Sequence, residues 1–197
     1  MGLNELVNNH CIMHINTMKR FCLAGGLLAA LLATISSCVY VDTYADERHD
    51  VLEGDTIPAF SVETIDGHTV RSEVLTNTVS VIVFGKPGCG RCLRFYDALD
   101  AVLVGDLYIR DHVSELVVCI GGEDVVRELY RERDYSFKCS AQNRSGLVTQ
   151  FVADASYPVV FFVNMDGTVA RRIDKAEMTT ETLSGLLTDL IDNPVNN

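Results

Sequence analysis

The expected fold follows from one stretch of the sequence, Val79-Ser-Val-Ile-Val-Phe-Gly-Lys-Pro-Gly-Cys-Gly-Arg-Cys92. Its first half, Val79–Phe84, is β-branched and mostly apolar, which predicts a strand buried on both faces. After Cys92, apolar residues recur at positions 95, 96, 99, 102 and 103 with charged residues between them, which predicts an amphipathic helix. The two cysteines therefore lie where a buried strand passes into a helix.

This position suits thiol chemistry. The amino terminus of a helix presents unpaired N–H groups and a partial positive charge, which stabilise a thiolate at Cys89. Cys92 can approach the same point from one turn further on, so a mixed disulfide on Cys89 can be resolved within the molecule. Arg91 adds positive charge beside the thiolate, and Gly90 leaves room for a docking substrate.

The flanking sequence alternates between further strands and helices. Asp66-Gly67 and Asp166-Gly167 are turn signals, each between two β-like runs, and therefore predict two hairpins. The order predicts an α/β domain with a central mixed sheet flanked by helices and an N-terminal β-hairpin extension. The predicted strands are 60–64, 69–74, 79–84, 116–120, 136–140, 159–163 and 168–173, and the predicted helices begin at 92 and span 123–133, 147–151 and 180–192.

Three features together carry a family resemblance. The strand–CxxC–helix unit, Tyr157-Pro158 before a strand and Asp166-Gly167 after it look like the thioredoxin superfamily. The lead-in Gly54-Asp-Thr-Ile-Pro-Ala-Phe60 resembles the opening of its TlpA/ResA-like, redoxin-type extracytoplasmic branch. The resemblance covers about residues 54–192. It implies a thioredoxin-like fold and a thiol–disulfide oxidoreductase that acts on protein disulfides outside the cytoplasm.

The resemblance also implies roles for individual residues. Cys89 would be the exposed nucleophile and Cys92 the resolving thiol. Pro158 would be a cis proline facing the pair, and the backbone at Tyr157 would pair with the bound substrate. The Cys89–Cys92 disulfide would serve in place of an external cofactor. The partners would be protein thiols or disulfides and an electron donor or acceptor at the membrane, with the direction of electron flow left open.

Three positions depart from the family pattern. Gly88 stands where the family usually has Trp before the first cysteine, and Val83 stands where many thioredoxins carry a buried Asp. The Glu that many TlpA-like domains carry after the second cysteine is replaced by Phe95 or Tyr96. Water or Lys86 would then have to carry protons during resolution.

The amino-terminal region predicts export. Met18-Lys-Arg20 precedes an uncharged run, Phe21–Ile35, that suits the apolar region of a secretory signal. Ile35-Ser-Ser-Cys38 resembles the bacterial lipobox, which implies cleavage before a lipidated Cys38. The alternative is a retained membrane helix over 21–35, although 15 residues are fewer than the roughly 20 that a spanning helix needs.

These signals predict three segments. Residues 1–37 would form the signal peptide region with its true start at Met18, residues 38–53 an acidic tether, and residues 54–197 the thioredoxin-like domain. With either a lipid anchor or a membrane helix, the domain would lie outside the cytoplasm. Val39 after the lipidated cysteine favours the periplasmic side of an outer membrane.

The net charge and the cysteine positions bear on nucleic-acid binding, on zinc binding and on further disulfides. A net charge of −11 argues against nucleic acid as a partner. Zinc is not expected, because a four-ligand site needs a second pair beside Cys89 and Cys92. Cys119 and Cys139 are interpreted as core residues or as a second disulfide.

The principal alternative function is a lipoprotein binding module on a thioredoxin scaffold, with a structural or inactive disulfide.

Overall fold

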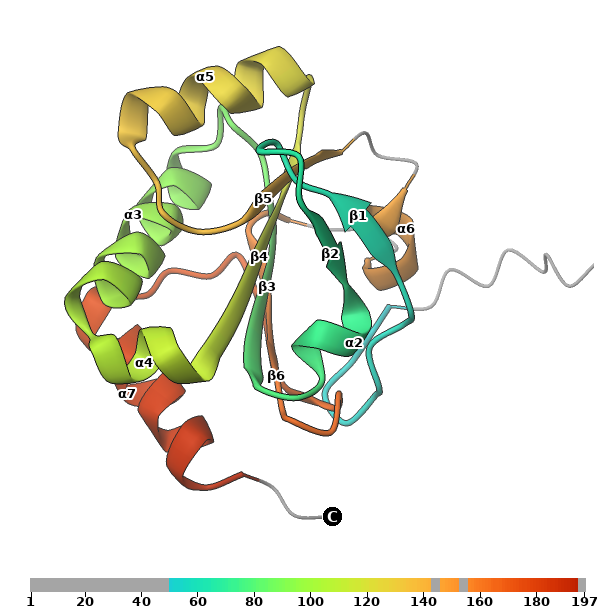
Figure 1. The fold of residues 1–197 in the computed structure, drawn as a ribbon, viewed down its shortest axis with the longest axis vertical. Coiled ribbons are helices and arrows are strands. Elements are labelled where there is room, and N and C mark those ends of the chain that lie inside the picture. The colour runs from blue at the N-terminus through green and yellow to red at the C-terminus, as the bar shows by residue number, and fades with distance from the viewer. Residues whose placement is uncertain (1–49, 143–145, 153–155, 195–197) are drawn as a thin grey trace, which may run out of the picture. The chain divides into compact units, whose positions relative to one another are not determined.

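The predicted strand at 79–84 is the middle of a five-stranded sheet (Figure 1). A computed structural model describes residues 50–142, 146–152 and 156–194 of the chain. The strand order is β5-β4-β3-β6-β7, in which β3 runs parallel to β4 and antiparallel to β6. The strands are β3 (Val79–Gly85), β4 (Val113–Ile120), β5 (Cys139–Gln142), β6 (Val159–Val163) and β7 (Val169–Asp174).

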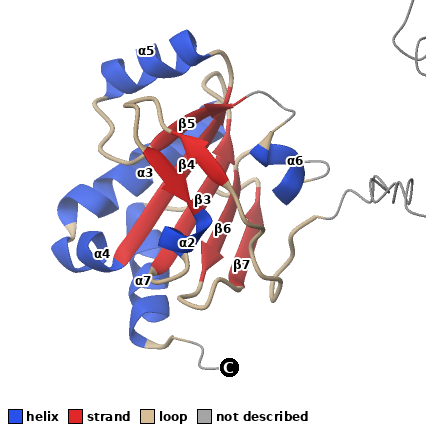
Figure 2. Ribbon diagram, turned by 45° about the vertical axis from the view of Figure 1, so that its right-hand side comes forward, coloured by secondary structure: helices blue, strands red, loops and turns tan. Residues whose placement is uncertain are grey.

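Different elements cover the two faces of the sheet (Figure 2). We call the side under the long helices the helical face and the opposite side the hairpin face. The helical face is covered by α3 (Gly90–Gly105), α4 (Leu107–His112), α5 (Glu123–Arg133) and α7 (Thr180–Asp192). The hairpin face is covered by β1 (Ser61–Glu63), β2 (Thr69–Arg71), α2 (Ser72–Leu75) and α6 (Leu147–Phe151).

The central strand β3 is apolar throughout because it contributes to both cores. Val81 and Val83 pack on the helical face, and Ile82 and Phe84 pack on the hairpin face. Successive side chains of a strand point to opposite faces, so a strand covered on both sides has no polar alternation. This confirms the prediction of a doubly buried strand.

Both outer edges of the sheet are partly covered by the residues that precede β3. Along β7, the Val169 N–H donates to the Asp55 carbonyl (2.8 Å), and the Gly54 N–H donates to the Val169 carbonyl (2.9 Å). Along β5, the Ile65 N–H donates to the Cys139 carbonyl (2.8 Å). The segment from Gly54 to Ile65 therefore contacts both ends of the strand order.

The α/β fold, the mixed sheet and the N-terminal hairpin are confirmed, and several element bounds are corrected. The strand predicted at 69–74 ends at Arg71, where α2 begins, and β4 begins at Val113 rather than at 116. Helix α4 was not predicted. It has no apolar stripe, because Ile109 is its only buried residue, and it is capped by the Asp106 carboxylate, which accepts hydrogen bonds from the N–H groups of Tyr108 (2.9 Å) and Ile109 (3.2 Å).

The last residues of the predicted tether pack against the domain. Val51 is buried, and its N–H donates to the Phe151 carbonyl (3.0 Å). The Arg172 guanidinium donates to the Val51 carbonyl (2.9 Å). Residues 1–49, which include the predicted signal, the lipobox and the rest of the tether, lie outside the described residues. Within the described ranges, no helix combines the length and apolarity needed to span a membrane.

Candidate active site

Cys89 and Cys92 form a disulfide at the first turn of α3, with their Cα atoms 5.2 Å apart. Cys89 is the N-cap residue, and its Sγ accepts a hydrogen bond from the Cys92 N–H at 3.2 Å. The turn before it is closed by the Cys89 N–H, which donates to the Lys86 carbonyl (3.3 Å). The sulfur of Cys89 therefore lies among the free N–H groups of a helix amino terminus, where a thiolate is favoured.

The two sulfur-bearing residues differ in exposure. Cys89 is half-buried, whereas Cys92 is fully buried on the helical face. Gly90, beside them, is exposed, and a side chain there would meet nothing closer than the Arg94 guanidinium at 3.9 Å. A partner approaching from solvent therefore reaches Cys89 before Cys92.

The Tyr157–Pro158 segment lies against the disulfide, and its peptide bond is cis, as the resemblance implied. The Tyr157 carbonyl oxygen is 4.0 Å from the Cys89 Sγ. Pro158 is buried and Tyr157 is half-buried. Beyond the segment, the Ala176 N–H donates to the Pro158 carbonyl (3.2 Å). The fold thus brings together residues separated by more than sixty positions in the sequence.

The charge of Arg91 is paired, which qualifies its predicted role beside the thiolate. Its Nε donates to Glu177 Oε1 (2.7 Å), and Arg94 donates to the same oxygen (3.1 Å). The hydrogen bonds from these two arginines hold the pKa of the Glu177 carboxyl below its usual range. The sequence pattern did not identify Glu177, because it belongs to the segment after β7, and only the fold brings that segment to the start of α3.

A second cation is close to the Tyr157–Pro158 segment. The Lys86 ammonium lies over the Tyr157 ring, 4.8 Å from its centroid, in a cation–π arrangement. Lys86 is exposed and immediately precedes the Pro87-Gly88 turn. Lys86, which the sequence offers as a proton carrier, therefore lies against the Tyr157 ring.

Behind the disulfide, Tyr96 occupies the space where Gly85 lacks a side chain. A Cβ on Gly85 would overlap the Tyr96 hydroxyl oxygen and would lie 3.3 Å from the Cys92 Cβ. Tyr96 is fully buried, and its hydroxyl has no hydrogen-bond partner among the described residues. Burial raises the pKa of this hydroxyl well above its usual value, so it keeps its proton.

Cys119 and Cys139 are buried and free, so they do not form the second disulfide that the sequence left open. Burial raises the pKa of the Cys119 thiol to about 11, although the nearby Tyr96 hydroxyl acts to lower it. Burial raises the pKa of Cys139 as well. Both are neutral thiols in the core of the helical face.

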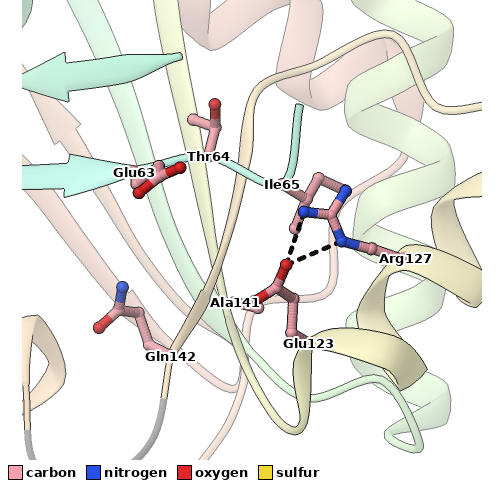
Figure 3. A pocket seen from close by; sticks show the side chains of 7 residues that line it. All are labelled: Glu63, Thr64, Ile65, Glu123, Arg127, Ala141 and Gln142. Carbon is pink, nitrogen blue, oxygen red and sulfur yellow. Dashed lines mark hydrogen bonds and ion pairs between the residues drawn. The ribbon is translucent and has the colours of Figure 1, made fainter. Parts of the chain in front are cut away.

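A separate hollow of about 250 Å³ opens between the hairpin, α5 and β5 (Figure 3). Arg127 in its wall is paired with Glu123 four residues earlier (2.5 Å), so its charge is already neutralised within α5. None of the lining residues is one of the predicted site residues. Across the described part of the chain, no group of three or more His, Cys, Asp or Glu residues is placed to hold a metal ion.

No protein-family model matches the sequence, and no curated protein is similar to it in sequence. Solved structures do match the fold. A secreted disulfide oxidoreductase of Mycobacterium tuberculosis, homologous to DsbE of E. coli, has a TM-score of 0.59 and 18% identity over 66% of this chain and 96% of that one. A thioredoxin-family thiol:disulfide interchange protein of Chlorobium tepidum has a TM-score of 0.61 and 14% identity over 68% and 94%.

A third match is the pneumococcal exposed lipoprotein thioredoxin of Streptococcus pneumoniae. Its TM-score is 0.57, with 20% identity over 68% of this chain and all of that one (100%). These identities are low, so the matches concern the fold. Together with the five-stranded sheet and the disulfide at the start of α3, they establish that this chain has the thioredoxin-like fold.

Proposed function

We propose that this protein is a thiol–disulfide oxidoreductase that acts on protein cysteines outside the cytoplasm through Cys89-Gly90-Arg91-Cys92. The observation that carries the proposal is the half-exposed Cys89 in a disulfide at the amino terminus of α3, directly against the Tyr157–Pro158 segment. In this proposal, the helix amino terminus stabilises the Cys89 thiolate, and the adjacent Tyr157 backbone would dock the substrate. The fold neighbours described as disulfide oxidoreductases support the same reading.

The proposed reaction follows from the difference in exposure. In the oxidising direction, a substrate thiolate attacks Cys89 Sγ, the Cys89–Cys92 bond breaks, and its electron pair leaves with the Cys92 sulfur. A second substrate thiolate then attacks the substrate sulfur of the mixed disulfide and releases Cys89 as a thiolate. The reducing direction is the reverse, in which Cys92 displaces the substrate from Cys89. In either direction two electrons pass between the two cysteine pairs.

The decisive experiment equilibrates the full chain with glutathione and then with dithiothreitol buffers. Differential alkylation and mass spectrometry would report the redox state of Cys89 and Cys92 separately from the other cysteines. A reduction potential near about −270 mV indicates a reductant, whereas a value near about −120 mV indicates an oxidant that introduces disulfides.

Two variants complete the test. Cys89→Ser should abolish exchange with a protein disulfide, whereas the matched change Cys119→Ser alters a buried free thiol and should leave exchange in place. A wild-type pair that equilibrates with neither buffer would contradict the enzyme proposal and would favour the binding module.

We further propose that Cys38 carries a lipid anchor and that residues 38–49 connect it to the domain. The support is the Ile35-Ser-Ser-Cys38 pattern and a fold neighbour described as an exposed lipoprotein thioredoxin. The folded part has begun by Val51, so the connecting segment is short. The domain would then act close to a membrane that holds its electron donor or acceptor.

Metabolic labelling with a clickable fatty acid tests the anchor. The wild-type chain should incorporate the label and sediment with membranes, and Cys38→Ser should do neither. Cys22→Ser, which changes a cysteine in the apolar run, is the matched control and should be labelled normally. Membrane association of Cys38→Ser without any label would instead support the retained helix over 21–35.

A further inference from the structure

The Tyr96 hydroxyl is a buried polar group that the disulfide chemistry described above does not use. Buried polar groups in proteins are nearly always hydrogen-bonded, and an exception calls for a specific reason. The Cys119 thiol is in side-chain contact with the hydroxyl, and each group shifts the pKa of the other, but no hydrogen bond of standard geometry reaches the hydroxyl among the described residues. In the oxidised protein the hydroxyl therefore has a thiol neighbour but no well-aligned acceptor.

The position of this donor is set by Gly85 and by the helix. Cys92 and Tyr96 are four residues apart in α3, so they lie on the same face of the helix, and both are buried. Both side chains also pack over Gly85: a Cβ there would lie 3.3 Å from Cys92 Cβ and 3.0 Å from Tyr96 Cζ, and closer still to the hydroxyl. The hydroxyl and the Cys92 side chain thus share one small space.

We propose that the Tyr96 hydroxyl is a positioning residue for Cys92, which donates a hydrogen bond to the Cys92 sulfur once the disulfide has opened. When the Cys89–Cys92 bond breaks, the Cys92 sulfur takes the electron pair and becomes free to turn about its Cα–Cβ bond. A neutral phenol donates to such a sulfur, and a hydrogen bond to a charged acceptor is stronger than one between neutral groups. The Tyr96 hydroxyl, rather than a buried carboxylate, would then fix the position of the Cys92 sulfur.

The groups around Tyr96 favour a phenol that donates a hydrogen bond over a phenol that loses its proton. The titratable residues that face it are Cys92 on its own helix, Cys119 on β4, Cys139 on β5, Tyr130 on α5 and Tyr135 in the segment before β5. None of them is a carboxylate or a cation, so nothing there would draw the proton from the phenol. Burial acts in the same direction by keeping the phenol protonated.

The test is a titration of Cys92 in the reduced full chain, labelled with 13C at cysteine Cβ and followed by NMR. In Tyr96→Phe, the proton affinity of the Cys92 thiolate should rise about tenfold, the typical effect of a lost hydrogen bond to a charged group. The equilibrium with dithiothreitol should shift toward the disulfide by a similar factor at pH values where Cys92 is ionised. It should not change at lower pH, where Cys92 is protonated.

Tyr130→Phe is the matched control. Tyr130 is also buried on the helical face, and its hydroxyl also lacks a partner among the described residues, but a Cβ on Gly85 would not have it among its nearest atoms. This variant should leave the Cys92 titration unchanged. Equal titrations in Tyr96→Phe and the wild type would overturn the inference. So would equal shifts in Tyr96→Phe and Tyr130→Phe, because a general packing change would then explain both.

A measurement on the wild type covers the case in which Tyr96→Phe does not fold. The 13Cζ signal of Tyr96 should move with the ionisation of Cys92, and a signal that stays fixed would overturn the inference. The inference rests on the proposed exchange function, but these titrations need no substrate. Failure of the wild-type pair to exchange with glutathione defeats the proposed function, whereas an unchanged Cys92 titration in Tyr96→Phe defeats only the role of Tyr96.

Discussion

The two faces of the sheet are buried to a similar degree, but they differ in whether their buried hydroxyl groups have hydrogen-bond partners. On the hairpin face the apolar cluster is made of aliphatic and Phe side chains, and the buried hydroxyl of Ser80 donates to the Leu75 carbonyl (2.7 Å). On the helical face the core includes three cysteines and two tyrosines, and the hydroxyls of Tyr96 and Tyr130 have no partner among the described residues.

We infer from this difference that the hairpin face serves the stability of the fold and that the helical face also influences the cysteine pair. An unpaired buried hydroxyl costs free energy, roughly 1–3 kcal/mol, so a core selected for stability alone would pair it or omit it. The hairpin face has no unpaired buried hydroxyl among the described residues, although the Arg172 Nε beside Phe161 is buried without a partner. The helical face, which lies directly behind the disulfide, has two such hydroxyls. We therefore expect changes on the hairpin face to alter stability alone, and changes on the helical face to alter the behaviour of the cysteine pair.

The largest effect should come from Phe151→Ala on the hairpin face. Phe151 is fully buried, and its ring centroid lies 5.1 Å from that of Phe84 and 5.4 Å from that of Phe161. Removing the ring leaves a cavity and should lower the free energy of unfolding by about 3–5 kcal/mol in urea denaturation. The exposed Val74→Ala is the control and should cost under about 0.5 kcal/mol. A changed reduction potential in folded Phe151→Ala would show that the hairpin face also affects the cysteine pair.

The next largest effect should come from Gly85→Ala, which tests the contact between Gly85 and Tyr96. The new methyl group overlaps the Tyr96 hydroxyl, so the variant should lose about 1–3 kcal/mol of stability. In a Tyr96→Phe background the overlap is relieved, and the same change should cost less by about 1 kcal/mol in a double-mutant cycle. Additive costs would show that the hydroxyl does not fill this space.

The central elements of the fold were predictable because their signals are local. The apolar run of β3, the helix-period stripe of α7 and the Asp-Gly turns each lie within a few residues, and the structure confirms them. Helix α4 was missed because its signal is a single capping residue, Asp106, rather than a repeat. Sequence periodicity therefore identified long elements well and short capped ones poorly.

The candidate site was only partly predictable. Cys89 and Cys92 are recognisable from their spacing, and Tyr157-Pro158 only through the resemblance. Glu177 carries no local signal, because its importance arises when the segment after β7 packs beside α3. The apolar pattern after Cys92 includes Tyr96, which predicts a buried ring, and the ring is buried. Its position four residues after Cys92 was the available clue, but an unpaired hydroxyl can be recognised only in three dimensions.

A third prediction concerns alkaline pH and the Cys119 thiol. Its folded pKa is raised to about 11 by burial, whereas an unfolded thiol ionises near 8.5. The contribution of Cys119 to stability is therefore complete below about pH 8.5 and is lost as the pH rises toward 11, by at most about 1.4 kcal/mol per pH unit. Urea denaturation between pH 8 and 11 should show a shallower decline for Cys119→Ala than for the wild type.

Val117→Ala is the control for that experiment. It shortens a buried side chain of the same strand and introduces no titratable group, so it should lower stability equally at every pH. If the Cys119→Ala curve runs parallel to the wild-type curve, the thiol does not titrate as its burial implies.

The smallest effect should come from Glu177→Gln, which frees Arg91 and Arg94 beside the disulfide. The unpaired charges should favour the Cys89 thiolate and raise its rate of alkylation roughly twofold at low salt, with a smaller effect at high salt. Wild-type protein should approach the variant's rate at acidic pH, because the Glu177 pKa is lowered and the pairing is lost only as the pH falls through it. Glu128→Gln on α5 should leave the rate unchanged.

The segment from Gly54 to Ile65 affects how a protein substrate of the proposed exchange reaction could approach this domain. Unfolded chains with reactive cysteines also carry exposed strands, and an open sheet edge would capture them by backbone pairing. Here the Asp55 carbonyl accepts from the Val169 N–H of β7, the Gly54 N–H donates to the Val169 carbonyl, and the Ile65 N–H donates to the Cys139 carbonyl of β5. These hydrogen bonds leave fewer free backbone groups on β5 and β7, which disfavours pairing of another chain with either edge of the sheet. In the proposed reaction, an incoming chain would instead meet the Tyr157 backbone, whose carbonyl oxygen lies 4.0 Å from the Cys89 Sγ.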